Sequence, residues 1–215
     1  MAELVVVRGT GTLEAQPDAA GLRIEARSRA KDSAAANRDV AAIAAAVDAV
    51  LDRHAAAIRR RSTSGLLVTP AYEWTDKGQR SVGWDGVRTV AVEITDAGVI
   101  GAVFAGVADA GGIAGSLQWL LDPGNPAHAA ARTAAAVDAR ARADAYAAAL
   151  GVTLGPVLEI REPATYPPGG GGAQYDMAPQ ALRAKSGGGG GGPEMAVDAP
   201  ELWVVAEVDV TFGLL

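Results

Sequence analysis

The sequence contains no cysteine and only two histidines, His54 and His128. Without thiols the chain can form no disulfide, no thiolate metal site and no cysteine nucleophile. The two histidines are far apart in the sequence, each at a position typical of helix packing or of a helix end, so a histidine metal site is not expected. The sequence therefore predicts neither a metal nor a cofactor.

Aromatic residues are also scarce, with 2 Phe, 4 Trp and 4 Tyr in 215 residues. The apolar fraction is nevertheless 49%, and alanine supplies much of it. A chain of this length and composition can bury a core, which should consist of helices packed closely on strands rich in Val and Leu. A roomy aromatic ligand pocket is not expected.

The chain has no excess of positive charge: 19 Lys and Arg stand against 25 Asp and Glu, a formal net charge of -6. Because a nucleic-acid partner needs a concentrated basic face, none is expected. The one dense basic run, Arg59 to Arg61, lies in a predicted strand whose successive side chains point to opposite faces. This favours a solvated strand edge over a polyanion site.

No apolar run reaches the length of a membrane span. The N-terminal segment "MAELVVVRG" lacks the basic region, the apolar stretch and the cleavage site of a signal peptide. The sequence as written therefore predicts a cytoplasmic protein without membrane insertion.

Strand and helix patterns follow one another with clear breaks. The third helix has the best-marked ends, because Asn125 can cap it, Pro126 can begin it and Gly151 can end it. The predicted elements are strands over 4–8 and 22–27, a helix from the Asp32 cap to about 54, strands over 58–74 and 82–94 joined by a hairpin turn, a helix over 97–110, a strand over 113–121, a helix over 126–150, and strands over 152–162 and 202–212.

The order ββαββαβαββ predicts an α+β fold with a single domain over residues 1–215. We expect a mostly antiparallel sheet covered on one face by two long helices. The span 163–200 holds two glycine runs and no apolar periodicity, which predicts a mobile Gly/Pro-rich loop. The face of the third helix that lies on the sheet is predicted to be a stripe of small residues: Ala130, Ala134, Val137, Ala141 and Ala145.

The segment "GTG" at residues 9–11 could suggest a phosphate-binding loop. Such a loop needs a third glycine and a helix that begins beside the phosphate, whereas this segment continues through Glu14 to Pro17 and a strand. Gly9 and Gly11 are better interpreted as relieving crowding where the first strand bends or bulges.

Residues that could support catalysis are isolated or paired with arginine. Asp138 and Asp144 each stand four residues from an arginine, which favours surface ion pairs over a general acid and base. No nucleophile elbow surrounds any of Ser62, Ser64 and Ser116. The sequence therefore predicts no catalytic or cofactor-binding residue and no enzyme.

Three motifs, in this order, resemble the SIMPL family, also called the domain of unknown function 541. They are "VRGTGTLEAQPDA" at 7–19, "GWDGVRTVAVEI" at 83–94 and "ARTAAAVDARARADAYAAALGVTLG" at 131–155. The resemblance covers nearly the whole chain and implies an α+β fold that can assemble into large hollow oligomers, in bacterial proteins that are often secreted or attached to the envelope. It implies no established catalytic residue. The sequence departs from the family in showing no signal peptide and in its long glycine-rich insertion.

The absent catalytic set and the resemblance predict a non-catalytic structural or interaction protein that forms homo-oligomers, with an envelope- or stress-related role. A further copy would cover an unpaired sheet edge, and the run Arg59 to Arg61 opposite Glu207 and Asp209 would fix the register. The alternative is a small-ligand or peptide-binding module that uses Trp74 and Trp84, although cross-strand packing is the default for such residues. An unrecognised hydrolase is the third class.

Overall fold

The computed structural model describes residues 3–76, 78–163 and 197–215. The described chain divides into two compact units. Unit 1 holds residues 3–17, 121–163 and 200–215, and unit 2 holds residues 18–76, 78–120 and 197–199. Most of the predicted loop over 163–200 lies outside the described residues, and the single domain over 1–215 stays a prediction.

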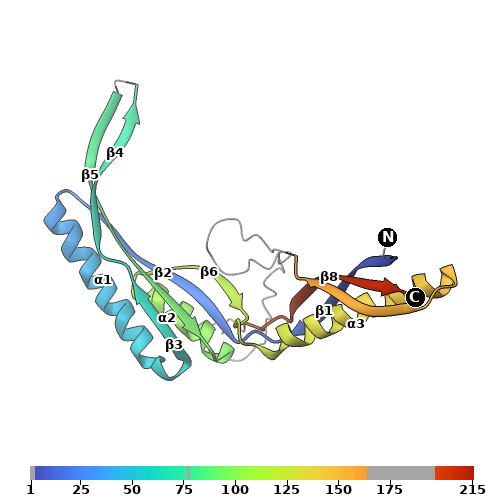
Figure 1. The fold of residues 1–215 in the computed structure, drawn as a ribbon. Coiled ribbons are helices and arrows are strands. Elements are labelled where there is room, and N and C mark those ends of the chain that lie inside the picture. Colours follow the sequence, from blue (N-terminus) through green and yellow to red (C-terminus); the bar gives the residue numbers. More distant parts are fainter. Residues whose placement is uncertain (1–2, 77, 164–196) are drawn as a thin grey trace. The chain divides into compact units, whose positions relative to one another are not determined.

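The predicted α+β class is confirmed, because the described elements are helices and antiparallel strands (Figure 1). The observed order is ββαβββαβαββ, which has one strand more than predicted because the segment 58–74 forms two strands. The elements are β1 (Leu4–Ala15), β2 (Ala19–Ala30), α1 (Ser33–Arg53), β3 (Ile58–Thr63), β4 (Leu67–Thr75), β5 (Gly78–Ile94), α2 (Ile100–Asp109), β6 (Ile113–Leu120), α3 (Pro126–Leu150), β7 (Leu154–Arg161) and β8 (Leu202–Leu214), with short 3-10 turns at Ala55–Ala57 and Ala97–Val99.

The prediction of one sheet beneath two long helices is wrong. The strands form two sheets, and the two long helices, α1 and α3, pack on different ones. The error has a physical origin: strand alternation shows which face of a strand is buried, but it does not show which distant strand is its partner. Strand β1 pairs with β8 from the other end of the chain, while β2, which follows β1 directly, joins the other sheet.

Unit 2 is built on a sheet with the strand order β3-β5-β2-β6, covered on one face by α1 and α2. The side chains of β2 alternate between the core and the open face from Ala20 to Arg27, with Leu22 and Ile24 buried and Arg23 exposed. Helix α1 begins at the predicted cap, where the Asp32 carboxylate accepts a hydrogen bond of 2.7 Å from the backbone N–H of Ala35. Apolar residues of both helices and of strands β2 and β5 form the core: Ala20, Leu22, Ile24, Val47, Val50, Leu51, Val90, Val92, Ile94, Ile100, Val103 and Val107.

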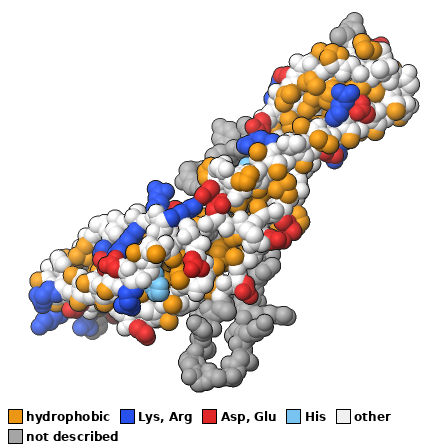
Figure 2. Space-filling view, turned by 90° about the horizontal axis from the view of Figure 1, so that it is seen from below, with side chains coloured by type: hydrophobic (Ala, Val, Ile, Leu, Met, Phe, Trp, Pro, Cys, Tyr) orange, Lys and Arg blue, Asp and Glu red, His pale blue; other side chains and the backbone are white. Residues whose placement is uncertain are grey.

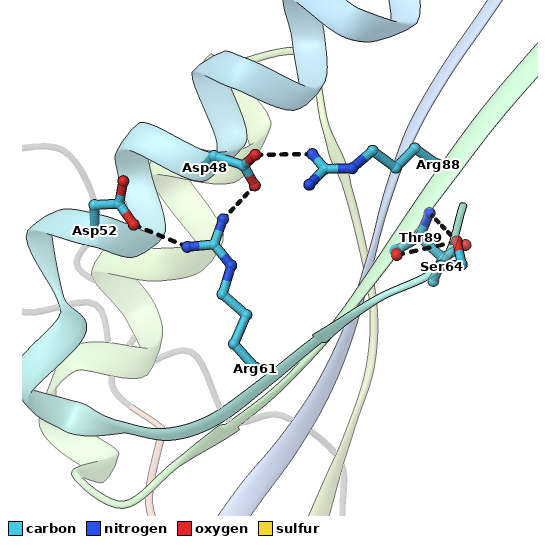
Figure 3. A network of polar contacts seen from close by, with 6 residues as sticks. All are labelled: Asp48, Asp52, Arg61, Ser64, Arg88 and Thr89. Carbon is cyan, nitrogen blue, oxygen red and sulfur yellow. Dashed lines mark hydrogen bonds and ion pairs between the residues drawn. The ribbon is translucent and has the colours of Figure 1, made fainter. Parts of the chain in front are cut away.

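Strands β3 and β4 both pair with the long strand β5, one after the other along its length. The predicted hairpin is thus confirmed, but the first of its two segments is interrupted between Thr63 and Leu67. At the interruption the Ser64 hydroxyl accepts a 3.0 Å hydrogen bond from the Thr89 N–H and lies 3.2 Å from the Thr89 carbonyl (Figure 3). The Ser64 backbone N–H also donates a 2.8 Å hydrogen bond to the Thr89 carbonyl, so the hydroxyl replaces only the backbone acceptor of this pair. The hairpin of β4 and β5 projects past the N-terminal end of α1 (Figure 1).

Unit 1 is a sheet with the order β1-β8-β7 on which α3 lies. Helix α3 has the predicted ends: the Asn125 side chain accepts a 2.9 Å hydrogen bond from the Ala127 N–H, and Gly151 adopts the left-handed conformation that ends a helix. The main cluster of buried side chains in unit 1 is small: Val7, Ala139, Ala143, Val210 and Phe212.

Gly9 and Gly11 lie in a regular part of β1 and face α3. A Cβ atom on Gly9 would lie 2.0 Å from the carbonyl oxygen of Ala135 and 2.5 Å from the backbone nitrogen of Ala139. A Cβ on Gly11 would lie 2.0 Å from the carbonyl oxygen of Ala131. The β-bulge predicted at these glycines is absent, since β1 pairs with β8 without a register shift, but the predicted relief of crowding is confirmed. The glycines instead let the helix backbone approach the strand closely.

The predicted contact face of α3 is also wrong. The buried positions are Ala131, Ala135, Ala139, Ala143 and Ala147, whereas Val137 is 64% exposed. Alanine occurs on nearly every side of this helix, so the apolar pattern gave no contrast between the faces. The glycines of β1 determine which face of α3 is buried, because only helix residues with small side chains fit against them.

Candidate functional site

The two edges of the unit 1 sheet differ in how they are protected. At the β1 edge, the Thr10 N–H donates a 2.9 Å hydrogen bond to the Asp138 carboxylate of α3. Asp138 also accepts a 2.8 Å hydrogen bond from Arg142. The backbone hydrogen bond, followed by the Arg142 contact, lowers the pKa of Asp138 below its usual value. A helix side chain thus occupies a donor that would otherwise be free at the edge.

The opposite edge, β7, has no comparable cover in the described part of the chain. Helix α3 packs on β1 and β8 and scarcely touches β7. Three apolar side chains of this short strand are exposed: Val157 by 47%, Leu158 by 55% and Ile160 by 68%. Pro156, near the start of β7, removes one backbone donor, but the residues after it keep theirs. Strand β7 is therefore a sheet edge able to pair with another strand.

The open face of the same sheet carries a group of charges that are matched within the chain. Arg8 donates hydrogen bonds of 2.7 and 3.0 Å to Asp209 and lies 3.5 Å from Glu207. The hydrogen bond from Arg8 lowers the pKa of Asp209. Beside them on β7, Arg161 donates a 2.6 Å hydrogen bond to Glu159. Glu207 and Asp209 already have a cation beside them, which removes the basis for pairing them with Arg59 to Arg61 of another copy.

The basic run of β3 is divided between two faces, as the sequence predicts. Arg61 turns toward α1, where it bonds to Asp48 and donates a 2.8 Å hydrogen bond to Asp52 (Figure 3). Asp48 also accepts a 2.9 Å hydrogen bond from Arg88, so one carboxylate joins β3 and β5 to the helix. Arg59 donates a 2.9 Å hydrogen bond to Glu93 on β5. The run is therefore largely neutralised within unit 2.

The outer side of α3 exposes further apolar groups. Tyr146 is 58% and Leu150 is 72% exposed, in addition to Val137. Figure 2 shows hydrophobic side chains spread over the face on which α3 lies, interrupted by charged groups. The two ion pairs predicted on this helix are present, with Arg140 to Asp144 at 3.1 Å and Arg142 to Asp138 at 2.8 Å.

The four tryptophans do not gather into one site. Trp74 is 82% exposed near the tip of the β4-β5 hairpin, where its partner in the ladder is Gln79. Trp84 lies further along β5 opposite Pro70, so at ~3.3 Å per residue the two tryptophans are about 15 Å apart along the strands. Trp119 packs against the core of unit 2, and Trp203 is 58% exposed on unit 1.

The histidines take structural positions at the ends of helices. His54 follows the last residue of α1, and its backbone N–H bonds to carbonyls of that helix. In unit 1 the Nε2 atom of His128 lies 3.1 Å from the carbonyl oxygen of Asp122, across the loop that precedes α3. Within the described ranges no group of three or more His, Cys, Asp or Glu side chains is arranged to hold a metal ion.

Sequence reasoning missed the edge of β7 as a candidate surface. The run "VLEIR" at 157–161 predicts a strand, but an edge strand differs from a central one only in its neighbours. The alternation of Leu158 and Ile160 with charged Glu159 and Arg161 is the one signal that could have suggested it, because charges on an edge strand are a common protection against uncontrolled pairing.

The chain matches the family SIMPL, described as "Protein of unknown function (DUF541)", over residues 5–212. It is 30% identical over 159 residues to a protein of Edwardsiella ictaluri (strain 93-146) named "Uncharacterized protein YggE". The match covers 73% of this chain and 66% of that relative, just under two thirds of its length. None of the helices in the described ranges has the length and apolar character needed to cross a membrane.

Proposed function

We propose that the chain, which belongs to the SIMPL family of proteins of unknown function, is a non-catalytic protein that assembles with further copies of itself. The observation that carries this proposal is the contrast between the two edges of the unit 1 sheet. Asp138 blocks a donor at the β1 edge, whereas β7 has exposed backbone groups and exposed apolar side chains next to them. A sheet edge whose backbone donors and acceptors have no partner is a template for another strand.

The charges of β7 suggest how two copies would pair. In an antiparallel pair of β7 strands related by a twofold axis at Ile160, Glu159 of one copy lies opposite Arg161 of the other. Both contacts of this kind form at once, because a twofold interface uses the same surface on both copies. Arg161 and Glu159 already pair within one chain at 2.6 Å, so exchanging these partners between copies fixes the register and adds little affinity.

The small core of unit 1 gives assembly an energetic role. The cluster around Val7 and Phe212 contains two alanines, which bury little apolar area, whereas unit 2 has a core of larger aliphatic residues. Small cores supply little stability. A partner that binds the folded state alone adds stability that grows with concentration, so pairing through β7 would stabilise the weaker unit.

The experiment is size-exclusion chromatography with light scattering on the full chain and on two charge variants, Glu159→Arg and Arg161→Glu. We expect the unmodified chain to form a multi-subunit species and each variant alone to associate less. An equimolar mixture of the two variants should recover the association, since arginines of one then face glutamates of the other. A rescue that depends on mixing cannot come from charge pairing within one chain.

A monomer near the chain mass of 21.7 kDa across micromolar concentrations would refute the assembly proposal. Association by the unmodified chain that neither variant weakens would place the contact elsewhere than β7. Circular dichroism of each variant serves as the control for folding.

The envelope- or stress-related role belongs to the same proposal and rests on the family resemblance. Fractionation of the native host cells tests it.

A second candidate function is peptide binding by the β4-β5 hairpin. It is favoured by the 82% exposure of Trp74 and the 53% exposure of Tyr72 on β4, a strand that pairs only with β5 among the described strands. A peptide that bound there would quench or shift the fluorescence of Trp74, and Trp74→Ala would abolish that part of the signal. An unchanged spectrum over a panel of extended peptides would exclude this function.

A further inference from the structure

The open face of the unit 2 sheet contains a hollow of about 440 Å³. Along β2 and β5, the residues that alternate with the buried Leu22 and Val92 point away from α1 and α2. The hollow therefore lies on the helix-free side of the sheet. Its lining comes from four neighbouring strands of that sheet.

The hollow exists because two small residues occupy its centre. Gly21 lies in one row across the sheet with Glu93 on one side and Gln118 on the other. Ala91 lies in the next row, between Arg23 and Ser62. Glycine and alanine leave the middle of the face low while longer side chains surround it, among them Leu120, whose Cδ1 lies 3.3 Å from the position of a Cβ on Gly21.

The rim carries more positive than negative charge. Arg23 is exposed and makes no ion pair within the described part of the chain. Arg60 has a side chain that is 74% exposed and lies 3.7 Å from one oxygen of Glu93, whose other oxygen already accepts the hydrogen bond from Arg59. Arg59 and Arg60 thus flank one carboxylate, and Arg23 lines the same hollow, in a protein whose net charge is -6. The local excess favours an anion.

We propose that this hollow binds a small oxyanion ligand, one that carries a carboxylate or phosphate group. Arg23 and Arg60, from strands on opposite sides of β5, would hold the charged group, since guanidinium pairs with oxyanions through two parallel hydrogen bonds. Polar groups for the rest of the ligand line the same rim: Ser62, Ser116 and Gln118. This function is independent of assembly through β7, which belongs to unit 1.

The test is isothermal titration of the full chain with inorganic phosphate and, separately, with succinate. Three variants accompany it. Arg23→Gln removes the unpaired cation, and Ala91→Leu fills the hollow without a change of charge. The matched control is Arg27→Gln, which removes an exposed arginine of the same strand that is already paired with Glu25 at 2.8 Å.

We expect binding of at least one of the two probes, with affinity lowered about tenfold or more by Arg23→Gln and by Ala91→Leu. Arg27→Gln should leave the affinity unchanged. Binding of phosphate alone or of succinate alone identifies the preferred oxyanion. Absence of binding to the unmodified chain overturns the proposal. An equal loss in Arg23→Gln and Arg27→Gln also overturns it, because the effect would then be general charge attraction.

Discussion

Replacement of Gly9 by alanine is the most direct test of how unit 1 is held together. The new Cβ would lie 2.0 Å from the carbonyl oxygen of Ala135 and 2.7 Å from the Cβ of Ala139. Comfortable contact requires about 3.5 Å, so helix and strand must separate by more than ~1 Å. Such a gap removes a quarter to a half of the dispersion attraction of every contact along the interface.

The atoms that clash are backbone atoms of α3, which cannot rotate away as a side chain can. Overpacking of a core costs about 1–3 kcal/mol and sometimes more, so we expect the Gly9→Ala variant to lose about 3–5 kcal/mol. For a unit of this size the thermal midpoint should fall by about 12 °C or more. Circular dichroism with heat and with urea measures both quantities.

A matched control lies in the same unit. Gly124 has no atom within 4 Å of its position for a Cβ, so Gly124→Ala should change stability by less than ~1 kcal/mol. The double variant Gly9→Ala with Ala139→Gly relieves the contact between side chains but leaves the one with the Ala135 carbonyl, and we expect little recovery. Full recovery in the double variant, or an unchanged midpoint for Gly9→Ala, would refute the close approach of α3.

Three further predictions concern the two faces of helix α3 and the carboxyl groups whose pKa values are shifted. Val137→Asp should change stability by less than ~0.5 kcal/mol because Val137 is exposed, whereas Ala139→Asp, at a fully buried position, should cost about 3 kcal/mol or more; urea denaturation compares them. The pKa values of Asp138 and Asp209 are lowered below the ordinary 3.8. The stability that these carboxylates contribute is therefore complete above that pH and is lost as the pH falls through the lower pKa of the folded state. In a pH series, the thermal midpoint of Asp138→Asn should fall less on acidification than that of the unmodified chain. A hydrogen bond with a second carboxyl group raises the pKa of Glu14 above the ordinary 4.5, so stability falls as pH rises through that range, and Glu14→Gln should raise the midpoint at neutral pH.

The ends of the helices could be predicted because their chemistry is local. An aspartate or asparagine cap bonds to a backbone N–H two or three residues later, and Gly151 supplies a conformation that other residues avoid. The β4-β5 hairpin was predictable for the same reason. The interruption at Ser64 was not, because it depends on a bond to Thr89, a residue on another strand.

Pairing between distant segments could not be predicted from local patterns. Arg8 and Asp209 are partners across 201 positions of sequence, and nothing near either residue indicates the other. The buried face of α3 could not be predicted for a related reason. Its inner and outer stripes are both rich in alanine, and the deciding information lies in two glycines of β1 more than a hundred residues away.

The same reasoning decides which surface is available for association. The sequence suggested pairing of Arg59 to Arg61 with Glu207 and Asp209 between copies, since opposite charges attract. The structure has paired most of these groups within their own units, and a charge that already has a partner gains little from a second one in water. Association between copies can use the backbone hydrogen-bonding groups and apolar side chains that the fold leaves without a partner. The donor of Thr10 at the β1 edge is occupied by Asp138, so the strongest remaining candidate in unit 1 is the backbone of β7 and the apolar side chains beside it.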